Sequence, residues 1–156
     1  MKITVCGGSG FLGSHVADAL TRAGHTVTVF DKTASPYLQP GQQMIQGDIL
    51  DGAALAAAVR GADAVYHLAA LADIAENNPQ AIAEANVIGT INLLEACRVA
   101  GVRRFIFASS VYVYSDKGSF YRCSKQAAEL FIEEYRQRYG LRYTILRYGS
   151  LYGPRA

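Results

Sequence analysis

The sequence has no tryptophan, only three cysteines and no apolar run long enough to cross a bilayer. Fifteen basic residues against thirteen acidic ones leave a formal net charge of +2, and these charges are scattered along the chain. Because there is no basic stripe, the composition favours neither nucleic acid nor a membrane surface as a partner. The N-terminus enters an apolar strand pattern with no secretory leader before it, so we expect a cytoplasmic protein.

The cysteines are Cys6, Cys97 and Cys123. Their number is odd and their spacing is not that of metal ligands. Such cysteines are typical of reduced, buried thiols in a reducing compartment. We therefore expect neither a disulfide nor a bound metal.

Glycines mark the first feature that points to a ligand. Gly7, Gly10 and Gly13 follow the apolar strand pattern of residues 2–6 and open an amphipathic helix pattern that ends at Gly24. A tight bend, a close approach to a pyrophosphate and close helix–strand packing each require a residue without a Cβ atom. The unpaired N–H groups at the start of the helix add an anion site. A plain turn is the alternative, but the context favours a dinucleotide clamp.

Two carboxylates follow at strand ends. Asp31 closes an apolar, β-branched stretch about twenty residues beyond the glycines, where a carboxylate can accept hydrogen bonds from both hydroxyls of an adenosine ribose. Its charge would repel a 2′-phosphate, which favours NAD over NADP; the alternative is that it only caps a turn. Asp48 fits two roles equally well, a bond to the adenine amino group or bonds to backbone N–H groups in its turn.

Strand and helix patterns alternate along the whole chain. Strands are expected at 2–6, 26–30, 44–46, 63–70, 104–108 and 143–147, and helices at 12–23, 52–60, 79–100 and 121–139. Asp51 can cap the helix at 52–60, and Asn78-Pro79 has the pattern of a helix start with proline at the first helical position. This alternation predicts one α/β domain over residues 1–156, a Rossmann-type doubly wound parallel sheet of about six strands ordered 3-2-1-4-5-6, with helices on both faces. Residues 71–77 are expected to form a loop over a cofactor. The helix at 79–100 should bury Ile82, Ala85, Ile88, Ile91, Leu94 and Cys97.

Three side chains have the chemistry of a redox site. Tyr121 and Lys125 are four residues apart in a predicted helix and project from one face. A neighbouring ammonium lowers the pKa of a tyrosine, and the phenolate can then take a proton from a substrate hydroxyl while hydride leaves the same carbon. This spacing often occurs by chance, so the hypothesis also depends on Ser110, which follows the fifth strand. His67, with no partner nearby in the sequence, is interpreted as structural.

Several motifs in order resemble the extended short-chain dehydrogenase/reductases, and within them the NAD-dependent epimerase/dehydratase group typified by UDP-glucose 4-epimerase. The motifs are Gly7 to Gly13 with Phe11-Leu12, the strand end at Asp31, Gly47-Asp48-Ile49, His67-Leu68-Ala69-Ala70, Asn86-Val87-Ile88-Gly89-Thr90, Ser109-Ser110, Tyr121 to Lys125, Leu146-Arg147-Tyr148 and Tyr152-Gly153-Pro154. The resemblance covers the chain from end to end.

The resemblance implies NAD as cofactor, with Tyr121 as acid/base, Ser110 orienting a sugar hydroxyl and Lys125 also holding the nicotinamide ribose. Ser110 is preferred to Ser109 because the family places this residue four positions before the tyrosine that is Tyr114 here. The cofactor-binding residues implied are Gly7, Gly10, Phe11, Leu12, Gly13, Asp31, Asp48, Ile49, Leu68, Ala69, Ala70 and Lys125.

The same resemblance implies a nucleotide-sugar substrate, a homodimer formed through the helices at 79–100 and 121–139, and a C-terminal substrate-binding lobe that this chain does not contain. Epimerisation is the favoured reaction. Val111 and Tyr112 stand where the family's dehydratases carry Asp-Glu, which argues against loss of water. The alternatives are an NAD-dependent reductase or dehydrogenase of another sugar or carbonyl compound, and a non-catalytic NAD-binding module.

Overall fold

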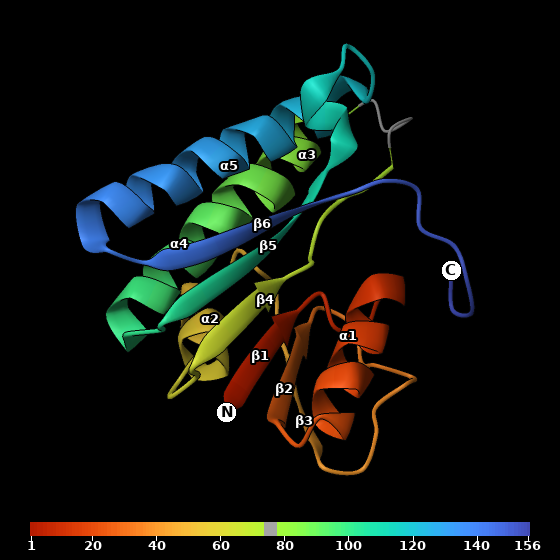
Figure 1. Ribbon diagram of the computed structural model, residues 1–156, viewed down its shortest axis with the longest axis vertical. Helices are drawn as coiled ribbons and strands as arrows, with labels where there is room; N and C mark the ends of the chain where they lie inside the picture. The colour runs from red at the N-terminus through yellow and green to blue at the C-terminus, as the bar shows by residue number, and fades with distance from the viewer. Residues whose placement is uncertain (74–77) are drawn as a thin grey trace.

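A six-stranded parallel sheet forms the centre of the protein (Figure 1). The structure, a computed structural model, describes residues 1–73 and 78–156. The expected order is confirmed as β3-β2-β1-β4-β5-β6, and all neighbouring strands run parallel. The strands are β1 (Lys2–Cys6), β2 (Thr26–Asp31), β3 (Gln42–Gln46), β4 (Ala64–His67), β5 (Arg104–Ser110) and β6 (Arg142–Tyr148).

Two of the helices begin at a residue whose side chain caps them. The helices are α1 (Phe11–Arg22), α2 (Gly52–Ala58), α3 (Pro79–Ile82), α4 (Gly89–Ala100) and α5 (Ser119–Tyr139), with a π-helical segment η1 (Ala83–Ile88) and a 3-10 segment η2 (Val111–Tyr114). The Asp51 carboxylate caps α2, as expected, by accepting hydrogen bonds from the first N–H groups of that helix. Asn78 caps α3 in the same way, and Pro79 occupies the first helical position.

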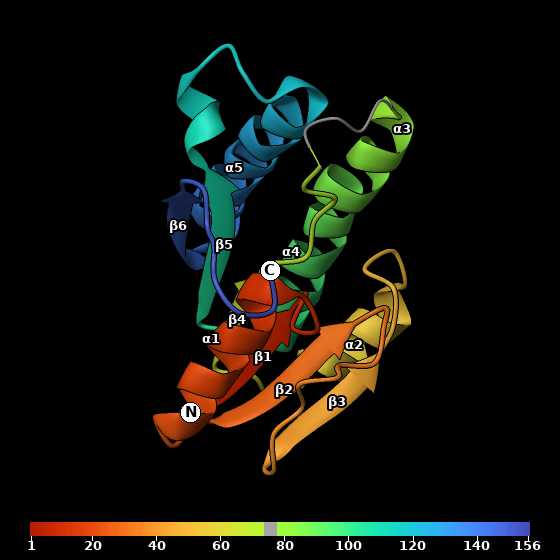
Figure 2. The same cartoon turned by 90° about the vertical axis from the view of Figure 1, so that its right-hand side faces the viewer.

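The two faces of the sheet are covered unequally. Helices α2, α4 and α5 pack on one face and α1 packs on the other, over β1 and β2 (Figures 1 and 2). Alternation along β1 serves both layers, because Cys6 belongs to the large core under the three helices and Val5 to the smaller core under α1. The large core includes the fully buried rings of Phe105 and Phe107, each of which contributes about 2–3 kcal/mol of burial free energy.

The segment expected to form one α-helix at 79–100 is not α-helical in its middle. Residues Ala83–Ile88 form a π-helix, which has more residues per turn than an α-helix and so rotates the face that follows. Ile88, expected in the core, is 47% exposed, and Gly89 and Thr90 are buried instead. Gly89 fits this place because a Cβ atom there would lie 2.7 Å from the Ile49 side chain. The exposure of Ile88 is therefore a correction to the predicted core.

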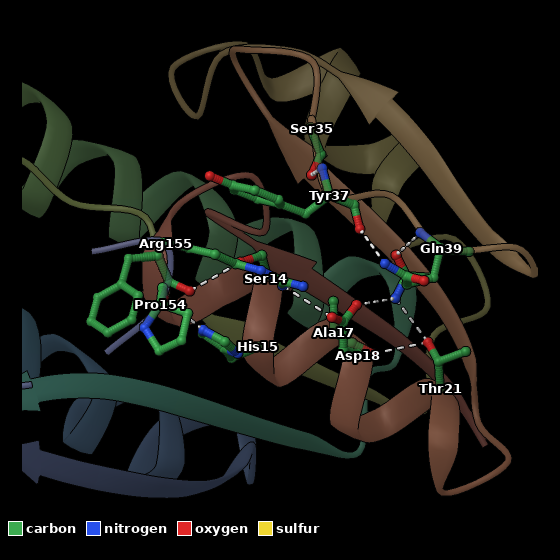
Figure 3. Close-up of polar contacts among 12 residues, drawn as sticks. Ser14, His15, Ala17, Asp18, Thr21, Ser35, Tyr37, Gln39, Pro154 and Arg155 are labelled. Atoms are coloured by element: carbon green, nitrogen blue, oxygen red, sulfur yellow. Dashed lines mark hydrogen bonds and ion pairs between the residues drawn. The ribbon is translucent and has the colours of Figure 1, made fainter. Parts of the chain in front are cut away.

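Residues 149–156, which follow β6, return across α1 (Figures 2 and 3). The Pro154 carbonyl lies 2.9 Å from His15 Nε2. The Arg155 guanidinium lies 3.0 Å from the Asp18 carboxylate, which is only 8% exposed, and stacks over the Tyr37 ring at 4.6 Å. The segment after the last strand is thus attached to α1 by a hydrogen bond and an ion pair, and to the connection between β2 and β3 by a cation–π contact.

The cysteines are all unpaired in the structure, but they are not all buried. Cys6 and Cys97 lie in the core, where burial raises the pKa of each thiol. Cys123 is exposed on α5, which corrects the expectation of three buried thiols. Across the described residues, no helix has both the length and the apolar character that crossing a membrane requires.

Candidate active site

Two adjoining pockets form a groove at the carboxyl ends of the strands, where a doubly wound sheet binds its ligands. The first has a volume of about 290 Å³ and the second about 600 Å³, and Gly7, Gly10, Leu68 and Ala70 line both. The first pocket also contains Asp31, Asp48, Ile49 and Ala69, and the second contains Phe11, Leu12, Gly13, Ser110, Tyr121 and Lys125. Every residue predicted for the site therefore lines this groove. Of the predicted loop at 71–77, residues 74–77 lie outside the described residues.

The glycine loop leaves no room for side chains where the chain turns. Gly7 has a φ of +81°, and a Cβ atom there would lie 2.4 Å from the Ala69 nitrogen. A Cβ atom on Gly13 would lie 2.0 Å from the Gly7 oxygen, so α1 packs directly against the loop. At Gly10 the closest atom would be 3.6 Å away, which leaves its open side to the groove. Gly8, which the spacing did not single out, is also needed, since a Cβ atom there would lie 2.9 Å from the Val5 oxygen.

Helix α1 points its N-terminus into the groove. Gly10 is its N-cap, no side chain caps the helix, and the first turn carries no acidic residue. The first N–H groups and the positive end of the helix dipole therefore lie at the second pocket, whose wall includes Phe11 and Leu12. This is the arrangement that binds a phosphate group.

Asp31 and Asp48 each hold a turn and line the first pocket. The Asp31 carboxylate accepts hydrogen bonds from the Ser9 N–H at 3.1 Å and from the Thr33 N–H at 3.2 Å. Asp48 accepts a bond from the Leu50 N–H at 2.8 Å. Both carboxylates therefore bond to backbone N–H groups in their turns, which is one of the two roles considered for each. These bonds are compatible with ligand binding, because both residues also line the first pocket.

Helix α5 and strand β5 bring Ser110, Tyr121 and Lys125 together in the second pocket. The Ser110 hydroxyl lies close enough to the Tyr121 phenol to lower the pKa of that phenol in part. Lys125 is buried, its ammonium donates to the Ala108 carbonyl at 2.8 Å, and it lies 5.5 Å from the centre of the Tyr121 ring. Burial lowers the pKa of Lys125 to about 8, although a neighbouring carboxylate opposes this shift.

The pKa of Tyr121 moves in the direction opposite to the one expected. Burial raises it above 10, the Ser110 hydroxyl lowers it in part, and the Tyr112 ring adds a further increase. The expectation that Lys125 pulls it down is wrong for the protein alone, because desolvation of the phenolate outweighs an ammonium whose proton is directed to a backbone carbonyl.

Ser109 and Ser110 have different partners, as neighbours on a strand must. Ser109 donates its hydroxyl to Glu129 at 2.5 Å, whereas Ser110 lines the second pocket with Tyr121 and accepts a bond from the Tyr112 N–H at 3.2 Å. The choice of Ser110 over Ser109 therefore agrees with the direction of the side chains.

Asn86, which the sequence showed only as part of a motif, clamps the segment that leaves β4. Its buried amide pairs with the Leu71 backbone, accepting from the N–H at 2.8 Å and donating to the carbonyl at 2.9 Å. It also donates to the Ser124 hydroxyl on α5 at 3.0 Å. Its place in the motif from Asn86 to Thr90 was the signal that the sequence offered for this role.

His67 is part of the core, as interpreted from the sequence. It is 1% exposed, and burial followed by repulsion from Lys125 lowers its pKa to about 3. Its Nε2 lies 2.8 Å from the Thr90 hydroxyl, which donates its own proton to the Asn86 carbonyl. The neutral ring therefore carries its hydrogen on Nε2. Elsewhere in the described chain, His, Cys, Asp and Glu side chains nowhere gather in threes that could hold a metal ion.

A parallel sheet ordered 3-2-1-4-5-6 with a glycine-rich turn from β1 to α1 defines a dinucleotide-binding protein of the Rossmann class. A family model places it further: residues 3–156 match the NAD dependent epimerase/dehydratase family. The chain belongs to this family, whose cofactor is NAD.

Solved relatives share the whole fold. UDP-glucose 4-epimerase from Thermotoga maritima, solved with UDP-glucose, is 34% identical with a TM-score of 0.94 over 99% of this chain and 57% of that one. The enzyme of the same name from Thermus thermophilus, solved with NAD, is 34% identical with a TM-score of 0.92 over the same shares.

Among curated proteins, a 2-alkyl-3-oxoalkanoate reductase from Stenotrophomonas maltophilia is 42% identical over 111 residues, which is 70% of this chain and 33% of the reductase. A putative UDP-glucose 4-epimerase from Methanocaldococcus jannaschii is 32% identical over 98% of this chain and 57% of its own length. The chain thus spans about a third to just over half the length of these relatives.

Proposed function

We propose that the groove binds NAD along its length. The first pocket would hold the adenosine. The Asp31 carboxylate would accept hydrogen bonds from the ribose hydroxyls, and Asp48 would lie near the adenine. The pyrophosphate would lie on the open side of Gly10 at the start of α1, where no side chain competes for the N–H groups. The second pocket, beside Lys125 and Tyr121, would receive the nicotinamide. When bound, NAD supplies a hydride acceptor at that end of the groove.

We further propose that the chain is the cofactor-binding and catalytic part of an NAD-dependent nucleotide-sugar epimerase. The observation that carries this is that Ser110, Tyr121 and the buried Lys125 ammonium line one pocket of about 600 Å³, with the ammonium 5.5 Å from the centre of the Tyr121 ring. Ser110 would orient a sugar hydroxyl, and Tyr121 would take its proton and later return it. The structural similarity to UDP-glucose 4-epimerases over the whole chain supports a sugar substrate.

The test is to incubate the protein with NAD and UDP-glucose and to follow formation of the 4-epimer by chromatography, together with the absorbance of reduced nicotinamide. An epimerase forms the second sugar with no net reduction of NAD, because the hydride returns to the same carbon. Absence of the epimer in a protein that binds NAD would refute this function.

A reductase or dehydrogenase is the second candidate, favoured by the 42% identity to a 2-alkyl-3-oxoalkanoate reductase. An assay with reduced NAD and a carbonyl compound separates the two functions, because a reductase consumes reduced NAD in proportion to product. Binding of NAD without turnover of a sugar or a carbonyl compound would indicate instead a non-catalytic NAD-binding module.

We also propose that two copies pair through α4 and α5 in the cytoplasm. Large apolar side chains on these helices are exposed, including Val99 at 72% and Leu130 at 64%. Burying both in a symmetric interface would remove apolar surface from water. Sedimentation at several concentrations tests the pairing, and a protein that stays monomeric at the highest concentration would refute it.

A further inference from the structure

Glu129 lies one helical turn beyond Lys125 on α5 and has a carboxylate that is only 9% exposed. Its oxygens are fully engaged. Ser109 donates its hydroxyl at 2.5 Å, and Arg147 donates from Nε at 3.0 Å and from Nη2 at 2.6 Å. This is the two-pronged geometry of a strong arginine–carboxylate pair, here with a third donor from a buried serine.

The partners of Glu129 come from both strands that face this part of α5. Ser109 and Arg147 are register partners in the pairing of β5 with β6. Ser109 is followed directly by Ser110. It is preceded by Ala108, whose carbonyl accepts a hydrogen bond from the Lys125 ammonium. Arg147 also bonds the Tyr114 hydroxyl at the end of η2. One carboxylate therefore ties α5 to the strand end that carries the candidate serine.

Glu129 is also the negative charge next to a buried cation. Its own pKa is lowered, since the bonds from Arg147 and Ser109 and the Lys125 charge together outweigh the effect of burial. The carboxylate is thus ionised at neutral pH and raises the pKa of Lys125 against desolvation. The other titratable groups that face Lys125 are Tyr121 on α5 and His67 on β4, and the His67 ring is neutral.

We propose that Glu129 is a positioning residue for the candidate active site, which fixes the β5 end bearing Ser110 and keeps an opposite charge beside the Lys125 ammonium. This inference rests on the function proposed above, because Glu129 matters to catalysis only if a protonated Lys125 is needed beside Tyr121. Glu129 touches neither the cofactor pocket nor the proposed substrate, so it acts through Lys125 and Ser109.

The experiment follows Lys125 itself, with neither NAD nor a sugar present. The chain has four lysines, Lys2, Lys32, Lys117 and Lys125, so carbon-13 labelling of lysine gives few NMR signals, and a Lys125→Met variant assigns the one of interest. The wild-type signal should titrate with a midpoint near pH 8. Glu129→Gln keeps the shape and an acceptor oxygen but removes the charge, and should lower the midpoint by roughly one pH unit.

The matched control is Glu134→Gln, which removes an exposed glutamate paired with Arg138 on the same helix and should leave the midpoint unchanged. Because Glu129→Gln leaves Arg147 without its partner, the double variant Glu129→Gln/Arg147→Gln provides a neutral version of the pair. It should also titrate below wild type, since Arg147 is not among the charges that act on Lys125.

The inference is overturned if Lys125 titrates at the wild-type pH in Glu129→Gln, if the control moves it equally, or if neither Glu129 variant folds, which would give Glu129 a role in stability alone. None of these results depends on turnover. An absence of sugar epimerisation in the wild type would refute the proposed function while leaving the titration result standing. Where the wild type turns over a sugar, the pH profile of the rate should shift between the wild type and Glu129→Gln in the same direction as the titration midpoint of Lys125.

Discussion

Replacing Gly13 by alanine should damage the fold, whereas the same change at Gly10 should damage the binding of NAD. The two glycines differ in what their missing Cβ atom would meet. At Gly13 it would lie 2.0 Å from the Gly7 oxygen and 2.7 Å from the Gly7 carbonyl carbon, both of them backbone atoms. At Gly10, which lines both pockets, it would have no neighbour closer than 3.6 Å.

The expected magnitudes follow from these contacts. No side-chain rotation can relieve a clash with backbone, so α1 must move away from the loop at a cost of about 3 kcal/mol. The better helix propensity of alanine returns about 1 kcal/mol. The net loss of about 2 kcal/mol corresponds to a fall in Tm of roughly 4–8 °C for a domain of this size. At Gly10, an N-cap in extended conformation, alanine costs no more than about 1 kcal/mol.

Thermal unfolding followed by circular dichroism measures the first effect, and calorimetric titration with NAD measures the second. Gly10→Ala should weaken NAD binding by about 10–100-fold, the equivalent of overpacking by one methyl group. A Gly13→Ala variant with wild-type Tm, or a Gly10→Ala variant with wild-type affinity, would refute the roles assigned to the loop.

Three further changes test the site. Tyr121→Phe should abolish turnover and retain NAD binding by calorimetry, and activity near that of wild type would exclude Tyr121 as the acid/base. Asp31→Asn, which keeps an acceptor for the Ser9 N–H, should raise the affinity for NADP relative to NAD, and an unchanged ratio would contradict the proposed ribose contact. For His67, the folded pKa of about 3 lies below the unfolded value of 6.5, so stability is lost as pH falls through this interval, at about 1.4 kcal/mol per pH unit. Denaturant titrations of the wild type and of His67→Gln measure this slope, which should be shallower in the variant, and equal slopes would refute the burial of a neutral ring.

The features that the sequence predicted correctly are those that one or two residues determine locally. Asp51 and Asn78 cap their helices because the capping bond needs only their own side chain and the next turn. The sheet order follows from right-handed crossovers between alternating strands and helices. The glycine loop could be located because Gly7 and Gly13 occupy backbone positions that exclude a Cβ atom.

The features that the sequence did not reveal depend on atoms far away along the chain. The π-helical turn that exposes Ile88 accompanies a bond from Thr90 to the Asn86 carbonyl and a contact between Thr90 and His67. The raised pKa of Tyr121 reflects burial by several elements at once. Glu129 meets Arg147 only because β6 lies beside β5, and local sequence gives no sign of that pairing.

The contact between α1 and the segment after β6 has a consequence for the order of folding. Pro154 and Arg155 lie more than 130 positions along the chain from His15 and Asp18. Closing so long a loop costs conformational entropy, and a single ion pair with one hydrogen bond returns little of it until the sheet between them exists. These contacts should form last and open first, so amide protons around Arg155 should exchange with solvent well before those of β1. During synthesis, α1 would complete its set of contacts only after residue 155 has left the ribosome.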